Sequence, residues 1–321
     1  METNILFEKF PLQIRDERQF KALTGTTPDQ FERLEAEFSK VYRDERRSAH
    51  ENAVGEGTRK RKPGGGRKGI LSQVHLKVFF LLYYLKTYPT FDSLGSVFRM
   101  SRSKACENVH GLMPILSKTL QNPNYMPHGK FETLEQFEEA FKNIDVLMAD
   151  ATERPVQRPA DDEKQAEHYS GKRKDHTVKN TILATKDKIV SFVGKTFCGS
   201  RHDFSIFQDD FPPETEWFRD IALYVDMGYT GIRNIYVGKN INVPYRRPRK
   251  SEKNPTRKMD MSQTNYNRAM AKIRIFVENS IAGLKRYRIM AHDFRNRKEG
   301  FIDDTIANCA GLWNMMLGVA V

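Results

Sequence analysis

Cysteine is scarce in this sequence, and from the placement of its cysteines we expect two kinds of stabilised site to be missing. The 321 residues include three cysteines, Cys106, Cys198 and Cys309, and no Cys-x-x-Cys pair. Three scattered thiols make neither a disulfide framework nor a zinc site, and they suit a reducing compartment. The fold must therefore be stabilised by burial of apolar side chains, and the 39% of residues that are hydrophobic are enough for a core.

Long apolar runs are also missing. The longest, Val78–Leu85, is far too short to cross a bilayer. The N-terminal ten residues lack the basic stretch and apolar core of a signal peptide. We therefore expect a soluble, intracellular protein, which would be cytoplasmic and nucleoid-associated in a bacterium or nuclear in a eukaryote.

Positive charge is what the sequence has in excess. Its formal net charge is +12 and its sequence pI is about 9.5. A polyanion is the natural partner of such a chain, and with no membrane segment expected we favour nucleic acid. The length suits about two domains.

The N-terminal half has the pattern of helices joined by a basic linker. One amphipathic helix is expected over residues 27–45, with Thr27 as its cap, inside an N-terminal helical segment of residues 1–47. Residues 48–69 are rich in glycine and charge, which predicts a flexible basic linker.

Residues 70–125 are expected to form a helix-turn-helix domain. Ser72 caps the first helix, which ends at Tyr88-Pro89. Thr90 starts a short second helix, and Ser101 caps a longer third helix after a tight break. A short helix, a tight turn and a longer helix are the pattern of this DNA-binding motif.

Residues 143–321 have the pattern of an α/β domain with a mixed sheet, because strands come first and helices end the chain. Apolar runs predict strands at 144–149, 155–158, 178–185, 189–197, 221–225 and 241–245. Helices are expected at 202–209, 262–285 and 303–317.

Two of these apolar runs stop on an aspartate, Asp150 and Asp226, and Glu278 lies in the periodic helix that follows. The ends of buried strands can converge at one edge of a sheet. Three carboxylates there would hold two Mg²⁺ ions for phosphodiester chemistry. Alternatively, each Asp is a turn or helix cap, and Glu278 pairs with Arg274 on a solvated face.

The helix of Glu278 carries two cations beside its apolar stripe. Arg274, Glu278 and Lys285 share one face. In this arrangement Lys285 would hold a DNA phosphate while Glu278 binds metal.

Several blocks of local sequence resemble bacterial insertion-sequence transposases related to Harbinger. The block around Asp150 resembles the first-acid motif of that family, and the block around Asp226 resembles the second. The spacing Arg-x₃-Glu-x₆-Lys around Glu278 matches the third. Further matching blocks cover residues 23–26, 65–68, 84–90, 169–179 and 199–203.

The resemblance implies a ribonuclease-H-like catalytic domain with a DDE triad at Asp150, Asp226 and Glu278, preceded by an all-α helix-turn-helix domain that binds transposon ends. It implies two Mg²⁺ ions, for which Mn²⁺ can substitute. Asp203 competes with Asp226 for the second-acid role. We prefer Asp226 because a buried strand fixes its position. Asp203 would then contact the metal ligands without binding the metal itself, or cap a helix.

Basic and polar residues outside the triad are expected to contact double-stranded DNA, through base edges or phosphates. A solvated helix face, a charged linker or a surface strand are the alternatives. The candidates are Arg67, Lys68, Ser101, Arg102, Ser103, Lys104, Asn108, Lys172, Arg173, Lys174, His176, Lys179, Arg274 and Lys285.

We therefore predict a DDE transposase that cuts at the ends of its element and joins the 3′-hydroxyl to target DNA, working as a homodimer on DNA. A transposase-derived DNA-binding protein with inactive chemistry is one alternative. A metal-dependent nuclease that cuts without joining is another, and an RNA-directed nuclease is a third.

Overall fold

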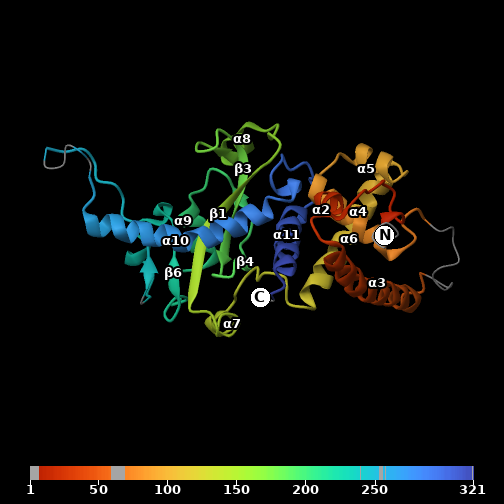
Figure 1. Ribbon diagram of the computed structural model, residues 1–321, viewed down its shortest axis with the longest axis horizontal. Coiled ribbons are helices and arrows are strands. Elements are labelled where there is room, and N and C mark those ends of the chain that lie inside the picture. Colours follow the sequence, from red (N-terminus) through yellow and green to blue (C-terminus); the bar gives the residue numbers. More distant parts are fainter. Residues whose placement is uncertain (1–6, 59–68, 239, 253–255, 257, 320) are drawn as a thin grey trace. The chain divides into compact units, whose positions relative to one another are not determined.

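The computed structural model describes residues 7–58, 69–238, 240–252, 256, 258–319 and 321 (Figure 1). The expected DNA contacts Arg67 and Lys68 lie outside these residues. The chain divides into two compact units. One consists of residues 1–126 and 285–292, and the other of residues 127–284 and 293–321.

The first unit is helical. Five helices and one 3₁₀ turn are described in it, namely α2 (Glu17–Thr24), α3 (Pro28–Gly55), α4 (Val74–Thr87), α5 (Phe91–Val97), α6 (Arg102–Gln121) and η3 (Arg288–Met290). Its core is aromatic, because Phe20, Phe31 and Phe79 are fully buried and the ring of Phe20 lies against the rings of the other two.

Two expectations for this unit are wrong in detail. Helix α3 begins at the expected Thr27 cap but continues to Gly55, so residues 48–55 are helical rather than part of a linker. Ser72 does not cap α4, because the N-cap is Gln73 and it makes no side-chain capping bond. The expected caps of α5 and α6 are confirmed, since Thr90 accepts from Ser93 N and Ser101 accepts from Lys104 N.

The turn between α5 and α6 depends on one glycine. Met100 N donates to Gly95 O at 2.8 Å, and a Cβ on residue 95 would lie 2.5 Å from Met100 O. Arg99 adopts a left-handed conformation with φ of 52°. This tight connection sets α5 against α6 in the helix-turn-helix arrangement that the sequence predicts.

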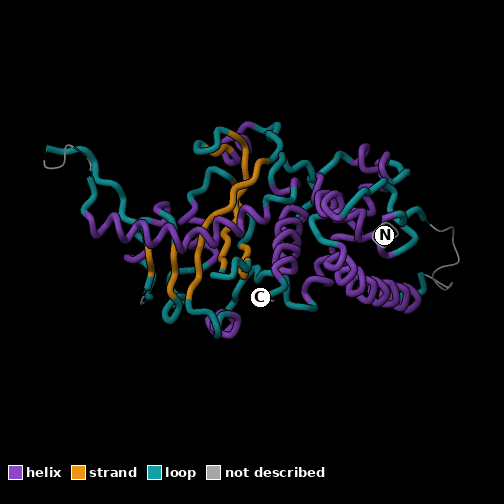
Figure 2. The backbone as a smooth tube through the Cα atoms, in the orientation of Figure 1, coloured by secondary structure: helices purple, strands orange, loops and turns teal. Residues whose placement is uncertain are grey.

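The second unit is built on a seven-stranded mixed sheet (Figure 2). Its strands are β1 (Val146–Pro155), β2 (Tyr169–Ser170), β3 (Asp175–Ala184), β4 (Val190–Val193), β5 (Phe197–Cys198), β6 (Ala222–Tyr224) and β7 (Ile241–Asn242). The order is β2-β3-β1-β6-β7, and β4 and β5 also pair with β3.

Strand β1 lies at the centre of the sheet. It pairs antiparallel with β3 and parallel with β6, and β6 pairs parallel with β7. An antiparallel β3–β4 hairpin on one side and parallel strands on the other confirm the expected ribonuclease-H-like mixed sheet.

Strand β1 is longer than the sequence pattern indicates. A strand ending before Asp150 and a separate strand at 155–158 were expected, but β1 is continuous from Val146 to Pro155. Asp150 therefore lies inside a strand, where it pairs with Ile182 of β3. The apolar run stops early because the buried side chains beyond it include polar ones, Thr152 and Arg154.

Helices cover this sheet. They are α7 (Leu134–Ala140), α8 (Asp162–His168), α9 (Asp203–Asp210), α10 (Met261–Leu284) and α11 (Phe301–Leu317). Helix α10 packs against β1, β3 and β6, and α11 packs against β4 and α10 (Figure 1). Leu147 and Ala149 enter a core rich in phenylalanine. Because strand side chains alternate, Met148 and Asp150 point to the opposite face.

Candidate functional site

The three acids singled out by the sequence come from three different elements. Asp150 lies in the middle of β1, Asp226 follows β6 as the N-cap of η1 (Met227–Tyr229), and Glu278 lies on α10. Parallel pairing of β1 with β6 brings the two aspartates to the same region of the sheet, and α10 crosses over both strands.

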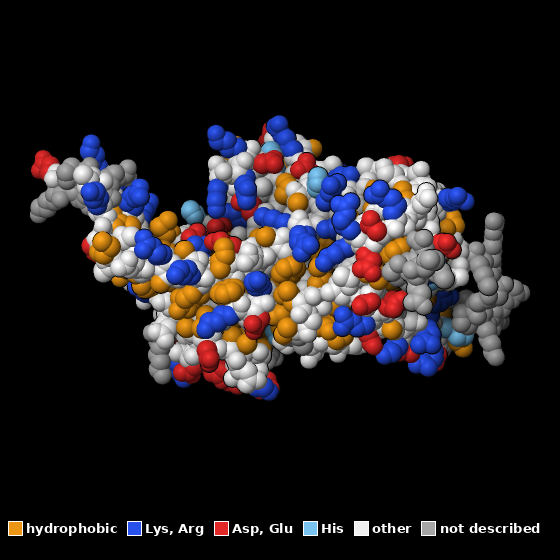
Figure 3. Space-filling model, viewed as in Figure 1, with side chains coloured by type: hydrophobic (Ala, Val, Ile, Leu, Met, Phe, Trp, Pro, Cys, Tyr) orange, Lys and Arg blue, Asp and Glu red, His pale blue; other side chains and the backbone are white. Residues whose placement is uncertain are grey.

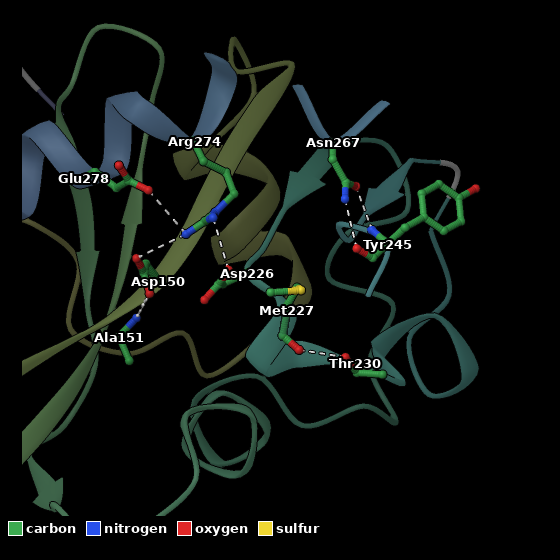
Figure 4. Close-up of polar contacts among 9 residues, drawn as sticks. All are labelled: Asp150, Ala151, Asp226, Met227, Thr230, Tyr245, Asn267, Arg274 and Glu278. Atoms are coloured by element: carbon green, nitrogen blue, oxygen red, sulfur yellow. Dashed lines mark hydrogen bonds and ion pairs between the residues drawn. The ribbon is translucent and has the colours of Figure 1, made fainter. Parts of the chain in front are cut away.

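The guanidinium of Arg274 lies between the three carboxylates (Figure 4). Its Nη1 is 3.1 Å from Asp226 Oδ1, and its Nη2 is 3.8 Å from Asp150 Oδ2 and 3.5 Å from Glu278 Oε1. The Arg274 side chain is 15% exposed, so these ion pairs are partly shielded from water. One cationic group thus gathers all three acids.

Asp150 is the least exposed of the three acids. Its side chain is 22% exposed, against 41% for Asp226 and 50% for Glu278. Burial raises the pKa of the Asp150 carboxyl to about 6, and the negative charges of Asp226 and Asp203 add to this. The Ala151 N–H, which donates to Asp150 Oδ1 at 2.8 Å, and Arg274 act in the opposite direction.

These residues fit a site for hard divalent cations. Carboxylate oxygens are the ligands that Mg²⁺ prefers, and a centre that already gathers three of them around one cation has the charge to hold another. Arg274 stands among the acids, so binding of a metal would require its guanidinium to move aside.

Asp203 lies in the first turn of α9 and is held by a different cation. Its Oδ1 is 3.0 Å from Lys179 Nζ, and Lys179 also donates to Arg201 O at 2.8 Å. Asp203 is not the cap of α9, because the N-cap is His202. Lys179 is 8% exposed and its ammonium group is held by these two contacts, so it is not available to contact a DNA phosphate as expected.

Tyr229 is a residue near the acids that sequence reasoning did not select. It is 1% exposed, and its hydroxyl makes no hydrogen bond to any residue that the structure describes. Burial, followed by the charges of Asp150, Asp203 and Asp226, raises the pKa of this hydroxyl well above its usual value. Its position in the block Asp226-Met227-Gly228-Tyr229 was the available signal.

A basic turn joins β2 to β3. Lys172, Arg173 and Lys174 are exposed there, and Arg173 Nε lies 3.6 Å from Glu153 Oε2. His176 is half-buried, with its ring 5.7 Å from that of Tyr169. In the space-filling view lysine and arginine side chains gather over α8 and β3 (Figure 3). This surface has the charge that a DNA backbone requires.

The N-terminal turn of α6 is also exposed and polar. Ser101, Arg102, Ser103 and Lys104 are exposed. Asn108 is less available, because its Nδ2 donates to Lys104 O at 2.7 Å. Arg99, which sequence reasoning passed over, is exposed in the turn just before this helix.

Lys285 is not part of α10, because the helix ends at Leu284 rather than at the expected residue 285. It belongs with residues 285–292 to the first unit, whereas Arg274 and Glu278 belong to the second.

Comparison with known families identifies the class of protein that this fold and site define. Residues 149–314 match the family model described as DDE superfamily endonuclease. Residues 71–122 match the model for the helix-turn-helix of the DDE superfamily endonuclease. The chain therefore belongs to the DDE superfamily endonucleases, and it carries their helix-turn-helix domain.

A particular relative points the same way. The chain is 30% identical over 246 residues to a probable transposase for insertion sequence element IS702 from Microchaete diplosiphon, which covers 76% of this chain and 80% of the relative. No solved structure gives a significant match. The resemblance to insertion-sequence transposases is confirmed, and it supports a nuclease or transposase role. Among the described residues no helix is long and apolar enough to cross a membrane.

Proposed function

We propose that this protein is a DNA transposase that binds the terminal repeats of its element, cuts the phosphodiester there and joins the 3′-hydroxyl to target DNA. The observation that carries the proposal is the convergence of Asp150, Asp226 and Glu278 on the Arg274 guanidinium. Membership of the DDE superfamily endonucleases supports the assignment of these residues.

In this proposal Asp150 and Asp226 hold two Mg²⁺ ions, and Glu278 completes the shell of one of them. The ions would polarise the attacking water or 3′-hydroxyl and stabilise the charge on the leaving oxygen. Mn²⁺ is expected to substitute. Asp150 must lose its proton to serve as a ligand, which the charge of a nearby cation favours.

Arg274 would act in two states. Without metal it compensates the charges of the three acids. With metal bound it moves away from them, and its guanidinium is then free to pair with a DNA phosphate, for which its planar fork is well suited.

The other contacts divide into two surfaces. The N-terminal turn of α6, with Ser101, Arg102, Ser103, Lys104 and Asn108, would read the terminal repeat in the major groove. Lys172, Arg173, Lys174 and His176 would hold DNA phosphates, and Lys285 remains a candidate for a phosphate contact. Two ends must be joined, so we expect a homodimer on DNA.

The test uses duplex DNA carrying the sequences that flank the protein's own coding region, where the ends of the element should lie. Wild type and Asp226→Asn are compared with Mg²⁺, cleavage and end joining are followed on denaturing gels, and binding by mobility shift. Asn keeps the shape of the side chain but loses the charge that holds a metal. Asp187→Asn, which changes an exposed acid in the β3–β4 turn, is the matched control.

We expect cleavage and joining by wild type and Asp187→Asn, and binding alone by Asp226→Asn. Binding without cleavage by all three proteins would favour the DNA-binding alternative. Cleavage without joined products would favour the nuclease. Cleavage that survives Asp226→Asn would refute the second-acid assignment and make Asp203 the next candidate.

A further inference from the structure

We propose that Glu167, His168 and Cys198 form a zinc site that is distinct from the acidic centre. Within the described part of the chain, these three side chains are the group whose ligand atoms all lie within 4.8 Å of one another. A thiolate, an imidazole and a carboxylate are the donors that bind Zn²⁺. The acidic centre offers only oxygens, so the two sites select different metals.

The spacing of two of the donors fits one ion. Cys198 Sγ lies 3.8 Å from His168 Nε2. In a tetrahedral site with Zn–S of about 2.3 Å and Zn–N of about 2.0 Å, the sulfur and nitrogen are about 3.6 Å apart. The two donors therefore need to move by only a few tenths of an ångström to share a metal.

The histidine ring is already oriented for this role. His168 Nδ1 lies 2.8 Å from Lys164 O. A carbonyl oxygen only accepts, so Nδ1 carries the proton and Nε2 presents its lone pair toward the thiol. A backbone carbonyl that fixes the tautomer in this way is a regular partner of metal-binding histidines.

The backbone brings the ligands together through contacts that do not involve a metal. Helix α8 ends at His168 and β5 ends at Cys198. Ser200 N donates to Glu167 O at 3.1 Å. A Cβ on residue 199 would lie 2.8 Å from His168 O and 2.1 Å from Thr177 Oγ1, so this approach requires Gly199.

The site is accessible and can be electrically neutral. Glu167 is exposed, and His168 and Cys198 are half-buried and line a cavity of about 620 Å³. Water can therefore supply the fourth ligand. On binding, the Cys198 thiol releases its proton to solvent, and the thiolate and carboxylate balance the two positive charges of the ion.

The predicted consequence is a cross-link between α8 and β5. Both elements pack against β3, whose first residue follows the exposed basic turn of residues 171–174. Zinc would thus stabilise the edge of the sheet that presents this turn. From three scattered cysteines we expected no zinc site. Sequence spacing could not show this one, because Cys198 follows Glu167 and His168 at a long interval and they meet only where α8 and β5 both pack against β3.

The test is titration of the untagged, full-length protein with Co²⁺ and Zn²⁺. Thiolate-bound Co²⁺ gives a near-ultraviolet charge-transfer band that oxygen ligands do not, so the acidic centre contributes nothing to this signal. We expect one equivalent of Co²⁺ to produce the band, Zn²⁺ to abolish it, and the melting temperature to rise with added Zn²⁺.

The chain contains its own matched control. Cys106 Sγ lies 3.8 Å from His110 Nδ1 on α6, the same separation, but no third ligand of the described part completes that pair. Cys106→Ser should keep both the charge-transfer band and the rise in melting temperature with Zn²⁺. Cys198→Ser should lose both, and His168→Gln should lose the rise in melting temperature.

Circular dichroism of each variant without metal checks that the fold is retained, and Glu167→Gln gives a weaker but independent readout at an exposed position. A band that persists in Cys198→Ser, or no band in wild type, would overturn the proposal. Asp150→Asn should leave the band unchanged, so this result is separable from the fate of the proposed transposase activity.

Discussion

The helix-turn-helix and the acidic centre are assembled in different ways. The candidate DNA-reading residues Ser101, Arg102, Ser103 and Lys104 are neighbours in sequence and exposed on one turn of α6. The candidate metal ligands Asp150, Asp226 and Glu278 come from distant parts of the chain and meet only through the sheet and α10.

The two regions also treat charge differently. On α6 the charges face water, and Lys104 forms an ion pair with Glu107, at 2.6 Å on the exposed helix surface. Around Asp150 the charges are partly buried and compensate one another through Arg274. Substitutions on α6 should therefore change binding alone, whereas substitutions around Asp150 should change chemistry, metal affinity and stability together.

The largest expected effect is on catalysis by Asp150→Asn. Loss of a metal ligand removes several kcal/mol of transition-state stabilisation, so we expect cleavage to fall by about 10³-fold or more. DNA binding measured by mobility shift should be unchanged, with Asp187→Asn as the control. Residual cleavage within tenfold of wild type would contradict the role of Asp150.

The same variant should stabilise the protein without metal. Because the folded state raises the pKa of Asp150 from 3.8 to about 6, its contribution to stability is full below pH 3.8 and is lost as pH rises through about 6. At pH 7, Asp150→Asn should therefore raise the free energy of unfolding by up to about 3 kcal/mol, measured by urea denaturation. A destabilised variant would show that the ion pair with Arg274 outweighs the cost of burial.

On the helix-turn-helix side, Arg102→Ala and Lys104→Ala should weaken binding to the terminal-repeat duplex. If the residue reads a base, we expect the binding free energy to fall by about 1–3 kcal/mol for the terminal-repeat sequence. If it holds a phosphate, we expect binding to weaken equally for all DNA sequences and to depend less steeply on salt. Lys118→Ala, at the other end of α6, is the control. Equal losses in all three variants would argue against a reading role for the N-terminal turn.

Acid should weaken metal binding at the acidic centre more than DNA binding by α6. Asp150 must be ionised to bind a cation, so below about pH 6 the affinity for Mn²⁺ should fall by up to tenfold per pH unit. Calorimetric titration of the metal-free protein with Mn²⁺ between pH 5 and pH 8 measures this affinity. An affinity independent of pH across this range would exclude Asp150 as a ligand.

The smallest effect is expected for Arg274→Gln. Removing the guanidinium removes a competing positive charge, so Mn²⁺ should bind the DNA-free protein more tightly by about 1 kcal/mol or more. Arg268→Gln, on the exposed side of the same helix, is the control. Weaker metal binding would indicate that Arg274 organises the acids rather than competing with the metal.

Much of the fold follows from local pattern. The caps at Thr27, Thr90 and Ser101 are correct, because capping depends on side chains within three residues of the helix start. The prediction that the strand ends before Asp150 was wrong, because a strand can continue past a charged residue when its neighbours are paired. Here β1 is paired with β3 from Met148 to Pro155.

The buried Arg154 shows the same limit. Its side chain is 1% exposed and donates to Asn180 Oδ1 at 2.8 Å, and burial lowers its pKa to about 10. A sequence pattern reads an arginine as a surface residue, because burial of a charge is costly without partners. The tertiary structure supplies those partners, because Asn180 lies on β3 and the guanidinium also donates to Thr196 Oγ1 at 3.3 Å and to Ile302 O at 3.4 Å.

The sequence by itself determined the helix-turn-helix, the two C-terminal helices, the order of the acids and the family, since these depend on short-range spacing and on local blocks of residues. The tertiary structure alone decided that Arg274 stands among the three acids, that Lys179 pairs with Asp203, and that Cys198 meets His168. These contacts join residues from separate strands and helices, and their distances are set by sheet register and helix packing, which no local pattern encodes.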